Sequence, residues 1–329
     1  MKAIVYKIYG PPEVLQLKEV ERPSPKPNEV LVQVFAASVN PGDWHAMRGT
    51  PFFQRLESGF PKPKVTILGA DVAGKVEAVG DVVKGFEPGD EVYGDLYWCG
   101  FGAFAEFVCV PEKSLSLKPT NLTFEEAAAV PQAAFTALHA LRDQGKVQPG
   151  QTVLINGASG GVGTFAVQIA ESFGAEVTGV CSSRNLKMVS SMGADHVIDY
   201  TMQDFTKNGQ RYDLIVDMVA IHSLANLCQA LKPGGKCVVV GFSTLAKMIK
   251  VTLLGPWISR MGNKELGMLM PEEDEADLIY MKELLEAGKV VPVIDRVYTL
   301  EQVPEAIGYL EKGHARGKVV ITVEQHQQV

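Results

Sequence analysis

Two patterns of hydrophobic and polar positions divide the chain. Over the first 120 residues, short β-rich runs alternate with turns that are rich in glycine and proline. This spacing predicts an antiparallel barrel or sandwich, because strands joined by short turns pair antiparallel. The expected strands are Ala3–Tyr6, Val30–Val34, Val72–Val79, Glu91–Tyr93 and Ala105–Val110.

Beyond Thr120 the pattern changes to strands that alternate with helices. An alanine-rich segment of helical periodicity, Glu125–Leu141, follows Thr123, a residue suited to cap a helix. The alternation predicts a parallel sheet with helices on both faces, and apolar runs such as VLIN fit strands that are buried on both sides. The expected strands are Thr152–Asn156, Glu176–Cys181, His196–Asp199, Leu214–Asp217 and Lys236–Gly241; the expected helices are Val162–Phe173, Leu186–Met192 and Glu275–Ala287. Val319–Val323 predicts a last strand, and periodicity leaves open which sheet it joins.

Composition and cysteine usage narrow the class of protein. The chain has 31 Lys and Arg against 38 Asp and Glu, a net charge of −7, which argues against a nucleic-acid or anionic membrane surface. Its five cysteines form no CxxC pair, so we expect reduced thiols in a cytoplasmic protein without a secretory signal. The apolar run around Val251–Ile258 is interrupted by Gly255 and Pro256 and is too short to span a bilayer.

The strongest single motif is the glycine-rich segment TVLINGASGGVG, residues 152–163. Gly157, Gly160 and Gly163 are spaced GxxGxxG between a predicted strand and a predicted helix. Glycine permits a tight turn and removes the Cβ that would block a pyrophosphate, and the first N–H groups of the helix favour an anion. The motif predicts a dinucleotide site; the alternative is a tight turn without a ligand. The expected contacts in this turn are Ser159, Gly160, Gly161 and Val162.

The end of the next strand bears on which dinucleotide is bound. In NAD sites an acidic residue there holds the ribose 2′-hydroxyl. Here Glu176–Cys181 is followed by Ser182, Ser183 and Arg184, so hydroxyls and a cation replace the carboxylate. We therefore predict NADPH as the cofactor, with Ser182 and Arg184 as contacts of the 2′-phosphate. The alternative is that these residues form only a solvated helix start.

Three segments together carry a family resemblance. They are GADVAGKVEAVGDVVKGFEPGDEVYG (Gly69–Gly94), the loop NGASGGVG and HARGKVVI (His314–Ile321). They resemble the medium-chain dehydrogenase/reductase superfamily, in its zinc-independent quinone oxidoreductase and enone reductase branch. The resemblance implies an α/β fold, with a GroES-like β-barrel catalytic domain and a Rossmann domain built on a doubly wound parallel sheet. It also implies a homodimer. The implied domains are residues 1–121, to which residues 266–329 return, and residues 122–265.

The chain departs from the zinc alcohol dehydrogenases of that superfamily at the metal positions. Their catalytic zinc needs a cysteine, a His-Glu pair and another soft ligand, whereas the matching places hold Asn40 and Ala70-Asp71. The structural zinc lobe needs four cysteines, and only Cys99 and Cys109 occur in that region. We therefore expect no metal.

The substrate side of the site is predicted from the same resemblance. Ser38–Trp44 takes the place of the zinc-binding loop, which makes Asn40, Asp43 and Trp44 the candidate catalytic residues. Asn40 is expected to donate to the acceptor oxygen and Trp44 to form an aromatic wall. The alternatives are turn chemistry at Asn40 and Asp43, which flank Pro41-Gly42, and a core or interface role for Trp44.

The resemblance also implies cofactor contacts outside the glycine turn. Thr136 lies on a helix that borders the nicotinamide, and the alternative is a hydrogen bond to its own backbone. Tyr200 is expected beside the adenosine phosphate, Phe242 beside the nicotinamide, and Lys318 in the closing segment. No general acid is nominated. The apolar stretch Thr244–Leu266 is expected to cover the substrate cleft or to form a subunit interface.

Together these features predict a reductase that transfers a hydride from NADPH to a quinone or an α,β-unsaturated carbonyl without a metal. Such electron-poor acceptors leave a phenolate or an enolate, which a few hydrogen bonds stabilise. Two alternatives stay open. One is a carbonyl or alcohol oxidoreductase on the same scaffold; the other is a non-enzymatic adaptor that binds NADPH.

Overall fold

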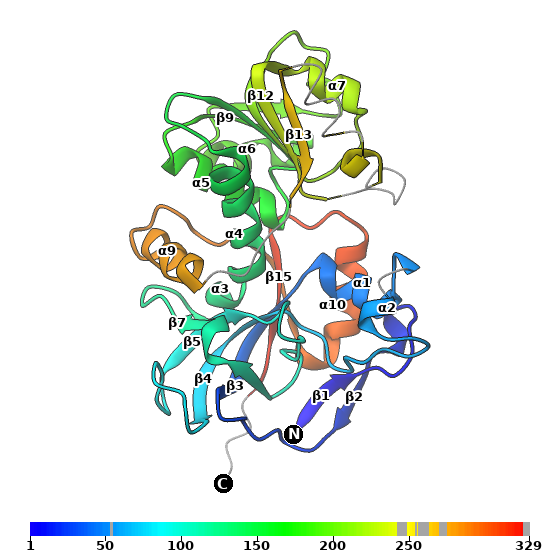
Figure 1. Cartoon of the computed structure of the whole chain (residues 1–329), viewed down its shortest axis with the longest axis vertical. Helices are drawn as coiled ribbons and strands as arrows, with labels where there is room; N and C mark the ends of the chain where they lie inside the picture. The colour runs from blue at the N-terminus through cyan, green and yellow to red at the C-terminus, as the bar shows by residue number, and fades with distance from the viewer. Residues whose placement is uncertain (53–54, 242–248, 254, 256–262, 270–274, 325–329) are drawn as a thin grey trace. The chain divides into compact units, whose positions relative to one another are not determined.

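The computed structural model describes residues 1–329 except 53–54, 242–248, 254, 256–262, 270–274 and 325–329. The chain divides into two units (Figure 1): the first is Met1–Gln132, Glu273–Ala287 and Pro292–Val329, and the second is Ala133–Glu272 and Gly288–Val291. The domain boundaries expected after residues 121 and 265 stay predictions. Phe242 and a large part of Thr244–Leu266 lie outside the described residues.

The first unit is built on a largely antiparallel sheet of seven strands. Their order is β14-β15-β3-β4-β5-β7, with β6 paired to β3, and β1 and β2 form a separate hairpin. The strands are β1 (Lys2–Val5), β2 (Gln16–Glu19), β3 (Glu29–Val39), β4 (Asp71–Val79), β5 (Glu91–Asp95), β6 (Phe107–Pro111), β7 (Leu115–Leu117), β14 (Ile294–Thr299) and β15 (Lys318–Thr322). The core behind this sheet includes Met47, Leu96 and Phe104, all fully buried. The predicted β-rich first part of the chain is confirmed.

The last strand belongs to the sheet of the first unit. β15 pairs antiparallel with β3, with Val319 opposite Val39, and it pairs in parallel with β14. This answers the question that periodicity left open, because strand pairing depends on contacts between residues far apart in the chain. The helices of this unit are α1 (Pro41–Arg48), α2 (Arg55–Ser58), α3 (Phe124–Ala128), α9 (Glu275–Glu286) and α10 (Val303–Glu311).

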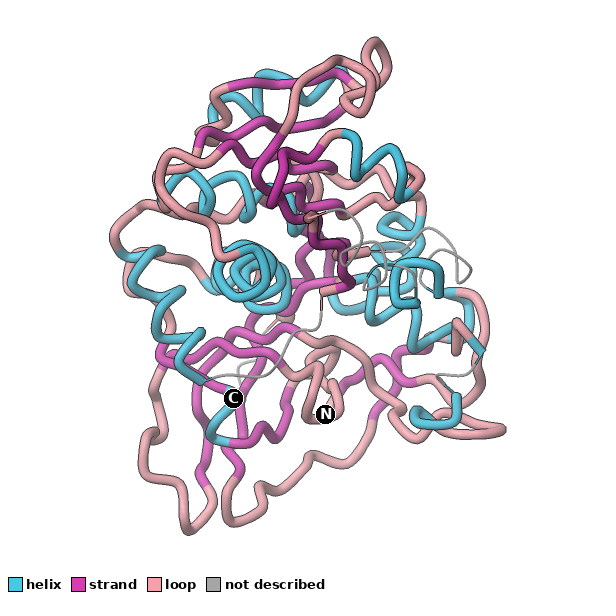
Figure 2. Tube along the Cα trace, turned by 45° about the horizontal axis from the view of Figure 1, so that its top comes forward, coloured by secondary structure: helices cyan, strands magenta, loops and turns pink. Residues whose placement is uncertain are grey.

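The second unit is a parallel sheet with helices beside it (Figure 2). Its strand order is β10-β9-β8-β11-β12-β13, and every neighbouring pair is parallel. Numbered from β8, this is the Rossmann order 3-2-1-4-5-6. The strands are β8 (Thr152–Asn156), β9 (Glu176–Cys181), β10 (His196–Asp199), β11 (Tyr212–Asp217), β12 (Leu231–Val239) and β13 (Glu265–Met268); the helices are α5 (Gly161–Ser172), α6 (Leu186–Ser191) and α7 (Leu224–Gln229).

The helix expected over Glu125–Leu141 is wrong as a single element. α3 ends at Ala128, and α4 (Pro131–Leu138) begins at a proline, followed by a π-helical turn. Pro131 has no N–H to donate and its ring clashes with the carbonyl of the preceding turn, so the helix is interrupted there. The predicted cap is confirmed, because Thr123 Oγ1 accepts from Glu126 N and Glu126 Oε2 accepts from Thr123 N. None of the helices in the described part of the chain has the length and apolar character that crossing a membrane requires.

Candidate functional site

The glycine-rich turn joins β8 to α5, in the context that the motif requires. Gly157 has a φ of 93°, in the left-handed region that favours glycine. A Cβ on Gly163 would lie 2.1 Å from the carbonyl oxygen of Gly157, so the helix approaches the turn more closely than a side chain allows. Gly160, the residue before α5, provides no side-chain cap, and Ser159–Val162 are partly exposed. The first N–H groups of α5 have no carbonyl partner within the helix, so the turn fits a bound anion.

Asn185 links this turn to the end of β9, and sequence reasoning missed it. Its Nδ2 donates to Ser159 Oγ at 2.9 Å and to Ser182 Oγ at 3.3 Å. The side chain is buried, and its Oδ1 has no hydrogen-bond partner among the described residues. Asn185 therefore holds two of the predicted contact hydroxyls side by side. An asparagine at the start of a helix is typical of a turn, so the sequence did not indicate that Asn185 bonds to Ser159 and Ser182.

Two further predicted contacts lie at the same edge of the sheet. Arg184 is exposed in the turn after β9. Tyr200 N donates to Cys181 O at 3.1 Å, and the Tyr200 side chain is 58% exposed. Because β8, β9 and β10 are parallel neighbours, their carboxyl ends bring the glycine turn, Ser182 and Tyr200 to one edge.

A carboxylate at this edge was not anticipated. Asp199 ends β10 and accepts hydrogen bonds from Ser183 Oγ at 2.5 Å and from Thr201 Oγ1 at 2.7 Å. The bond from Ser183, followed by the one from Thr201, lowers the pKa of Asp199 below its ordinary value. Asp199 is therefore charged at neutral pH and engages the hydroxyl beside Ser182. Its negative charge at this edge of the sheet would repel a 2′-phosphate bound beside Ser182.

The first unit contains a buried polar cluster around the carboxylate of Asp71, which begins β4. Asp71 Oδ2 accepts from Ser38 Oγ at 2.5 Å, from Asn40 Nδ2 at 2.8 Å and from Lys318 Nζ at 3.2 Å. Its Oδ1 accepts from Gln132 N at 2.9 Å. We call Ser38, Asn40, Asp71, Gln132 and Lys318 the Asp71 network. It connects the end of β3, the start of α1, the first turn of α4 and the start of β15.

The amide of Asn40 is fully engaged within this network. Its Oδ1 accepts from Lys318 Nζ at 2.5 Å, and its Nδ2 donates to Asp71 Oδ2 and, more weakly, to Ser38 O at 3.4 Å. Asn40 and Lys318 are each 3% exposed. Donation from Asn40 to an acceptor oxygen would require one of these bonds to break, which favours a positioning role. The expected substrate contact at Asn40 and cofactor contact at Lys318 stay predictions.

Asp43 is buried completely, and among the described residues its carboxyl bonds only to backbone N–H groups. Its Oδ2 accepts from Asn40 N at 2.8 Å and its Oδ1 from Gly69 N at 2.9 Å. Burial raises the pKa of this carboxyl to about 7 despite the two N–H donors. Asp43 thus joins the first turn of α1 to the segment before β4. These are the turn-forming hydrogen bonds that the sequence offered as the alternative role for Asp43. A catalytic role for Asp43 stays a prediction.

The remaining predicted residues are less constrained by the structure. Trp44 is partly buried, packs against the core of the first unit and stacks on His45 with ring centroids 3.7 Å apart. His45 Nδ1 lies 2.8 Å from Thr50 O, and burial lowers the pKa of its imidazole. Thr136 is partly exposed on α4. The roles predicted for Trp44 and Thr136 are untested by these contacts.

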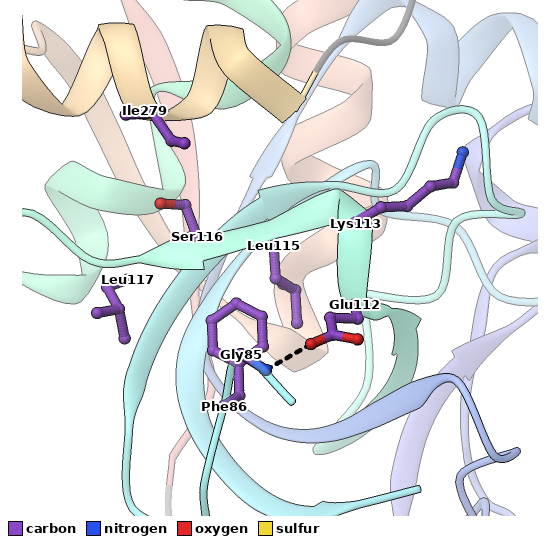
Figure 3. Close-up of a pocket in the computed structure, with 8 residues that line it drawn as sticks. All are labelled: Gly85, Phe86, Glu112, Lys113, Leu115, Ser116, Leu117 and Ile279. Carbon is purple, nitrogen blue, oxygen red and sulfur yellow. Dashed lines mark hydrogen bonds between the residues drawn. The ribbon is translucent and has the colours of Figure 1, made fainter. Parts of the chain in front are cut away.

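A separate pocket of about 310 Å³ opens on the first unit (Figure 3). Phe86, Leu115 and Ile279 give it an apolar lining. Glu112 Oε1 accepts from Gly85 N at 2.5 Å and from Lys84 N, which fixes the loop at its rim. No member of the Asp71 network lines this pocket, so it is not part of the candidate site.

The side chains at the positions of the superfamily's zinc ligands present a poor donor set for a metal. The ammonium of Lys318 bonds to both Asn40 and Asp71. Zinc sites use thiolate, imidazole and carboxylate donors. At these positions Asn40 and Asp71 already bond to the Lys318 ammonium, whose positive charge opposes the binding of a metal cation. Across the residues that the structure describes, no group of three His, Cys, Asp or Glu side chains is arranged to hold a metal. The five cysteines, all of them described, are free.

Comparison with known proteins places this architecture in a family. A model described as an alcohol dehydrogenase GroES-like domain matches residues 26–120, and one described as a zinc-binding dehydrogenase matches residues 192–321. The 2-methylene-furan-3-one reductase of Solanum lycopersicum is 38% identical over 98% of this chain and 79% of that protein. The chloroplastic NADPH-dependent alkenal/one oxidoreductase of Arabidopsis thaliana is 34% identical over 98% of this chain and 79% of that protein.

A solved structure agrees with both the sequence matches and the fold. The quinone oxidoreductase from Coxiella burnetii has a TM-score of 0.87 and 31% identity, covering 98% of this chain and 99% of that one. The first unit matches the GroES-like model, and the second has the Rossmann strand order. The chain therefore belongs to the medium-chain dehydrogenase/reductase superfamily, in its quinone oxidoreductase and enone reductase branch.

Proposed function

We propose that this protein is an oxidoreductase that transfers a hydride from NADPH to a quinone or an α,β-unsaturated carbonyl without a metal ion. The glycine turn between β8 and α5 carries the proposal. Its left-handed Gly157 and its side-chain-free contact at Gly163 suit a pyrophosphate against the start of α5. A nicotinamide dinucleotide is accordingly the cofactor, and it supplies the hydride when bound.

The 2′-phosphorylated form of the cofactor is the finer part of the proposal. Exposed Arg184 and partly exposed Ser182 support it, as does the name of the Arabidopsis relative. Asp199 opposes it, because its charge lies on the neighbouring strand end. We expect the cation to prevail, because a guanidinium forms charge-assisted hydrogen bonds with a phosphate, whereas the Asp199 carboxylate already accepts from Ser183 and Thr201. The proposed contacts are Thr136, Ser159, Gly160, Gly161, Val162, Ser182, Arg184 and Tyr200.

The choice of acceptor follows from what the residues of the first unit can do. Without a Lewis acid, an alkoxide has little to stabilise it, whereas a quinone or enone delocalises the added charge. The names of the relatives from Solanum lycopersicum, Arabidopsis thaliana and Coxiella burnetii support these classes. We propose that Asn40 and Asp43 shape the loop at the start of α1 and that the partly exposed ring of Trp44 contacts the acceptor.

The test is a panel of acceptors followed by the absorbance of NADPH. The panel holds an ortho-quinone, a para-quinone, a short enone and a saturated aldehyde, each assayed with NADPH and NADH and with a chelator. The expected result is turnover of quinones or enones that prefers NADPH and survives the chelator. Activity with saturated aldehydes alone would favour the carbonyl oxidoreductase, and NADPH binding without any turnover would favour the adaptor.

We also propose a homodimer in the cytoplasm. The edge strands β10 and β13 of the parallel sheet are the surfaces through which we expect the copies to pair. The five free cysteines support a reducing compartment. Light scattering tests the dimer, because a monomer mass over a wide concentration range would contradict it.

A further inference from the structure

The Asp71 network brings together segments that are far apart in the sequence. Ser38 and Asn40 come from the end of β3 and the residue before α1, Gln132 from the first turn of α4, and Lys318 from the start of β15. All of them bond to one carboxylate, and Lys318 lies 278 residues from Asn40 along the chain. No sequence pattern requires a charged residue to be buried here. The network therefore depends on the tertiary structure and does not follow from regular secondary structure.

The buried charges of Asp71 and Lys318 restrict this network to one favourable arrangement. Asp71 is fully buried and Lys318 is 3% exposed, so each ion depends on the other for compensation. An isolated ion at this depth is strongly unfavourable, and a pair is tolerated only with good geometry and further hydrogen bonds. The bonds from Ser38, Asn40 and Gln132 to Asp71 supply them. A shift of any one segment would leave a buried charge short of a partner.

The Asp71 network determines the orientation of the Asn40 amide. Lys318 requires its oxygen and Asp71 requires its nitrogen, so the side chain has a single orientation. Asn40 precedes α1, and its backbone N–H bonds to Asp43. The ion pair thus fixes the start of the helix that carries Trp44. In the zinc enzymes of this superfamily a metal ion ties the corresponding loop.

We propose that Lys318 and Asp71 are positioning residues, whose ion pair holds the loop Ser38–Trp44 and the first turn of α4 in the arrangement needed for turnover. The Lys318 ammonium thereby holds the loop in place, as a metal ion does in the zinc enzymes of this superfamily. Neither residue needs to touch the acceptor. The effect on turnover rests on the function proposed above; the ordering of the loop does not.

The experiment compares Lys318→Met, Asp71→Asn and the double variant with wild type. Lys312→Met is the matched control, because Lys312 is exposed on the same C-terminal segment and carries the same charge. Hydrogen exchange measures the order of the amides in residues 38–48 and at Gln132. Thermal midpoints, NADPH affinity, kcat and KM are measured on the same preparations.

We expect each single variant to lose thermal stability and to exchange the loop amides faster, with kcat reduced on the order of 100-fold, as small misplacements of a site can do. In Asp71→Asn the NADPH affinity should stay within about twofold, because the proposed phosphate contacts lie in the other unit; Lys318→Met should weaken it further only if Lys318 also contacts the cofactor. The double variant removes both buried charges, so its thermal midpoint should recover. Its loop exchange and kcat should not recover, because Asn40 still lacks the ammonium. Lys312→Met should match wild type in every measurement.

Two results would overturn the proposal. If the double variant recovers kcat together with its thermal midpoint, the pair is only a stabilising element. If loop exchange is unchanged in all variants, the pair does not order the loop. Should wild type reduce no acceptor at all, the proposed function fails, while hydrogen exchange still decides whether Lys318 and Asp71 position the loop.

Discussion

Asp43 accepts the backbone N–H of Gly69 at 2.9 Å, which joins the first turn of α1 to the segment that leads into β4. Its other oxygen accepts from Asn40 N, so both oxygens of a completely buried carboxyl accept from main-chain N–H groups. Burial outweighs these two donors and raises the pKa of Asp43 from 3.8 to about 7. The geometry of the loop and the pH dependence of stability are therefore coupled through one side chain.

This coupling predicts a pH-dependent contribution to stability. A carboxyl whose folded pKa is raised favours folding below its unfolded pKa, and this contribution is lost as pH rises through the folded value. Relative to Asp43→Asn, wild type should lose up to about 4 kcal/mol of unfolding free energy as pH rises from about 4 to about 7. Urea unfolding at several pH values measures the difference. A difference between the two proteins that is flat with pH would contradict the prediction.

Arg184 should determine the preference for NADPH. Arg184→Ala removes a charge-assisted hydrogen bond, worth about 1.5–3 kcal/mol, from the 2′-phosphate. The KM for NADPH is expected to rise by about 10- to 100-fold, with little change for NADH. Lys289→Ala, which removes an exposed charge from the same unit, is the control. Equal effects on both cofactors would show that Arg184 does not recognise the phosphate.

Asp199 should act in the opposite direction. Its lowered pKa keeps it charged, and it lies beside the hydroxyls at the end of β9. In Asp199→Asn the repulsion of a 2′-phosphate is removed, so the KM for NADPH should fall by a few-fold at low ionic strength, and less in high salt. Steady-state kinetics at two salt concentrations measure the change. An unchanged ratio of NADPH to NADH efficiency would place the phosphate away from Asp199.

Two glycines of the same turn should respond differently to alanine. A Cβ at Gly163 would lie 2.1 Å from a backbone oxygen, whereas the nearest atom at Gly160 is 3.5 Å away. Gly163→Ala is expected to cost about 1–3 kcal/mol of stability and to weaken cofactor binding, because the backbone cannot yield without moving α5. Gly160→Ala should stay within about 0.5 kcal/mol of wild type in stability. Similar losses in both variants would exclude close packing as the cause.

The parallel sheet was predictable because its signals are local. β8, β9 and β10 occupy the ranges that hydrophobic runs indicated, and Thr123 caps α3 as expected. The glycine turn was recognised because a left-handed residue and a strand–helix junction both leave their mark in sequence. The split between α3 and α4 was missed because alanine-rich periodicity outweighed the effect of Pro131 in the interpretation.

The order of residues alone determines three features of this protein. They are the strand-forming segments with their polarity, the glycine turn, and the absence of zinc-type donors at residues 40 and 70. They depend on side-chain chemistry and on neighbours within a few positions. Only the tertiary structure brings Lys318 to Asn40 and Asp71, sets Asn185 between Ser159 and Ser182, and places Asp199 beside Ser183. Apart from the bond between Asn185 and Ser182, these contacts join residues 16 to 278 positions apart. Which charges meet in a buried site is decided by how strands pair, not by local pattern.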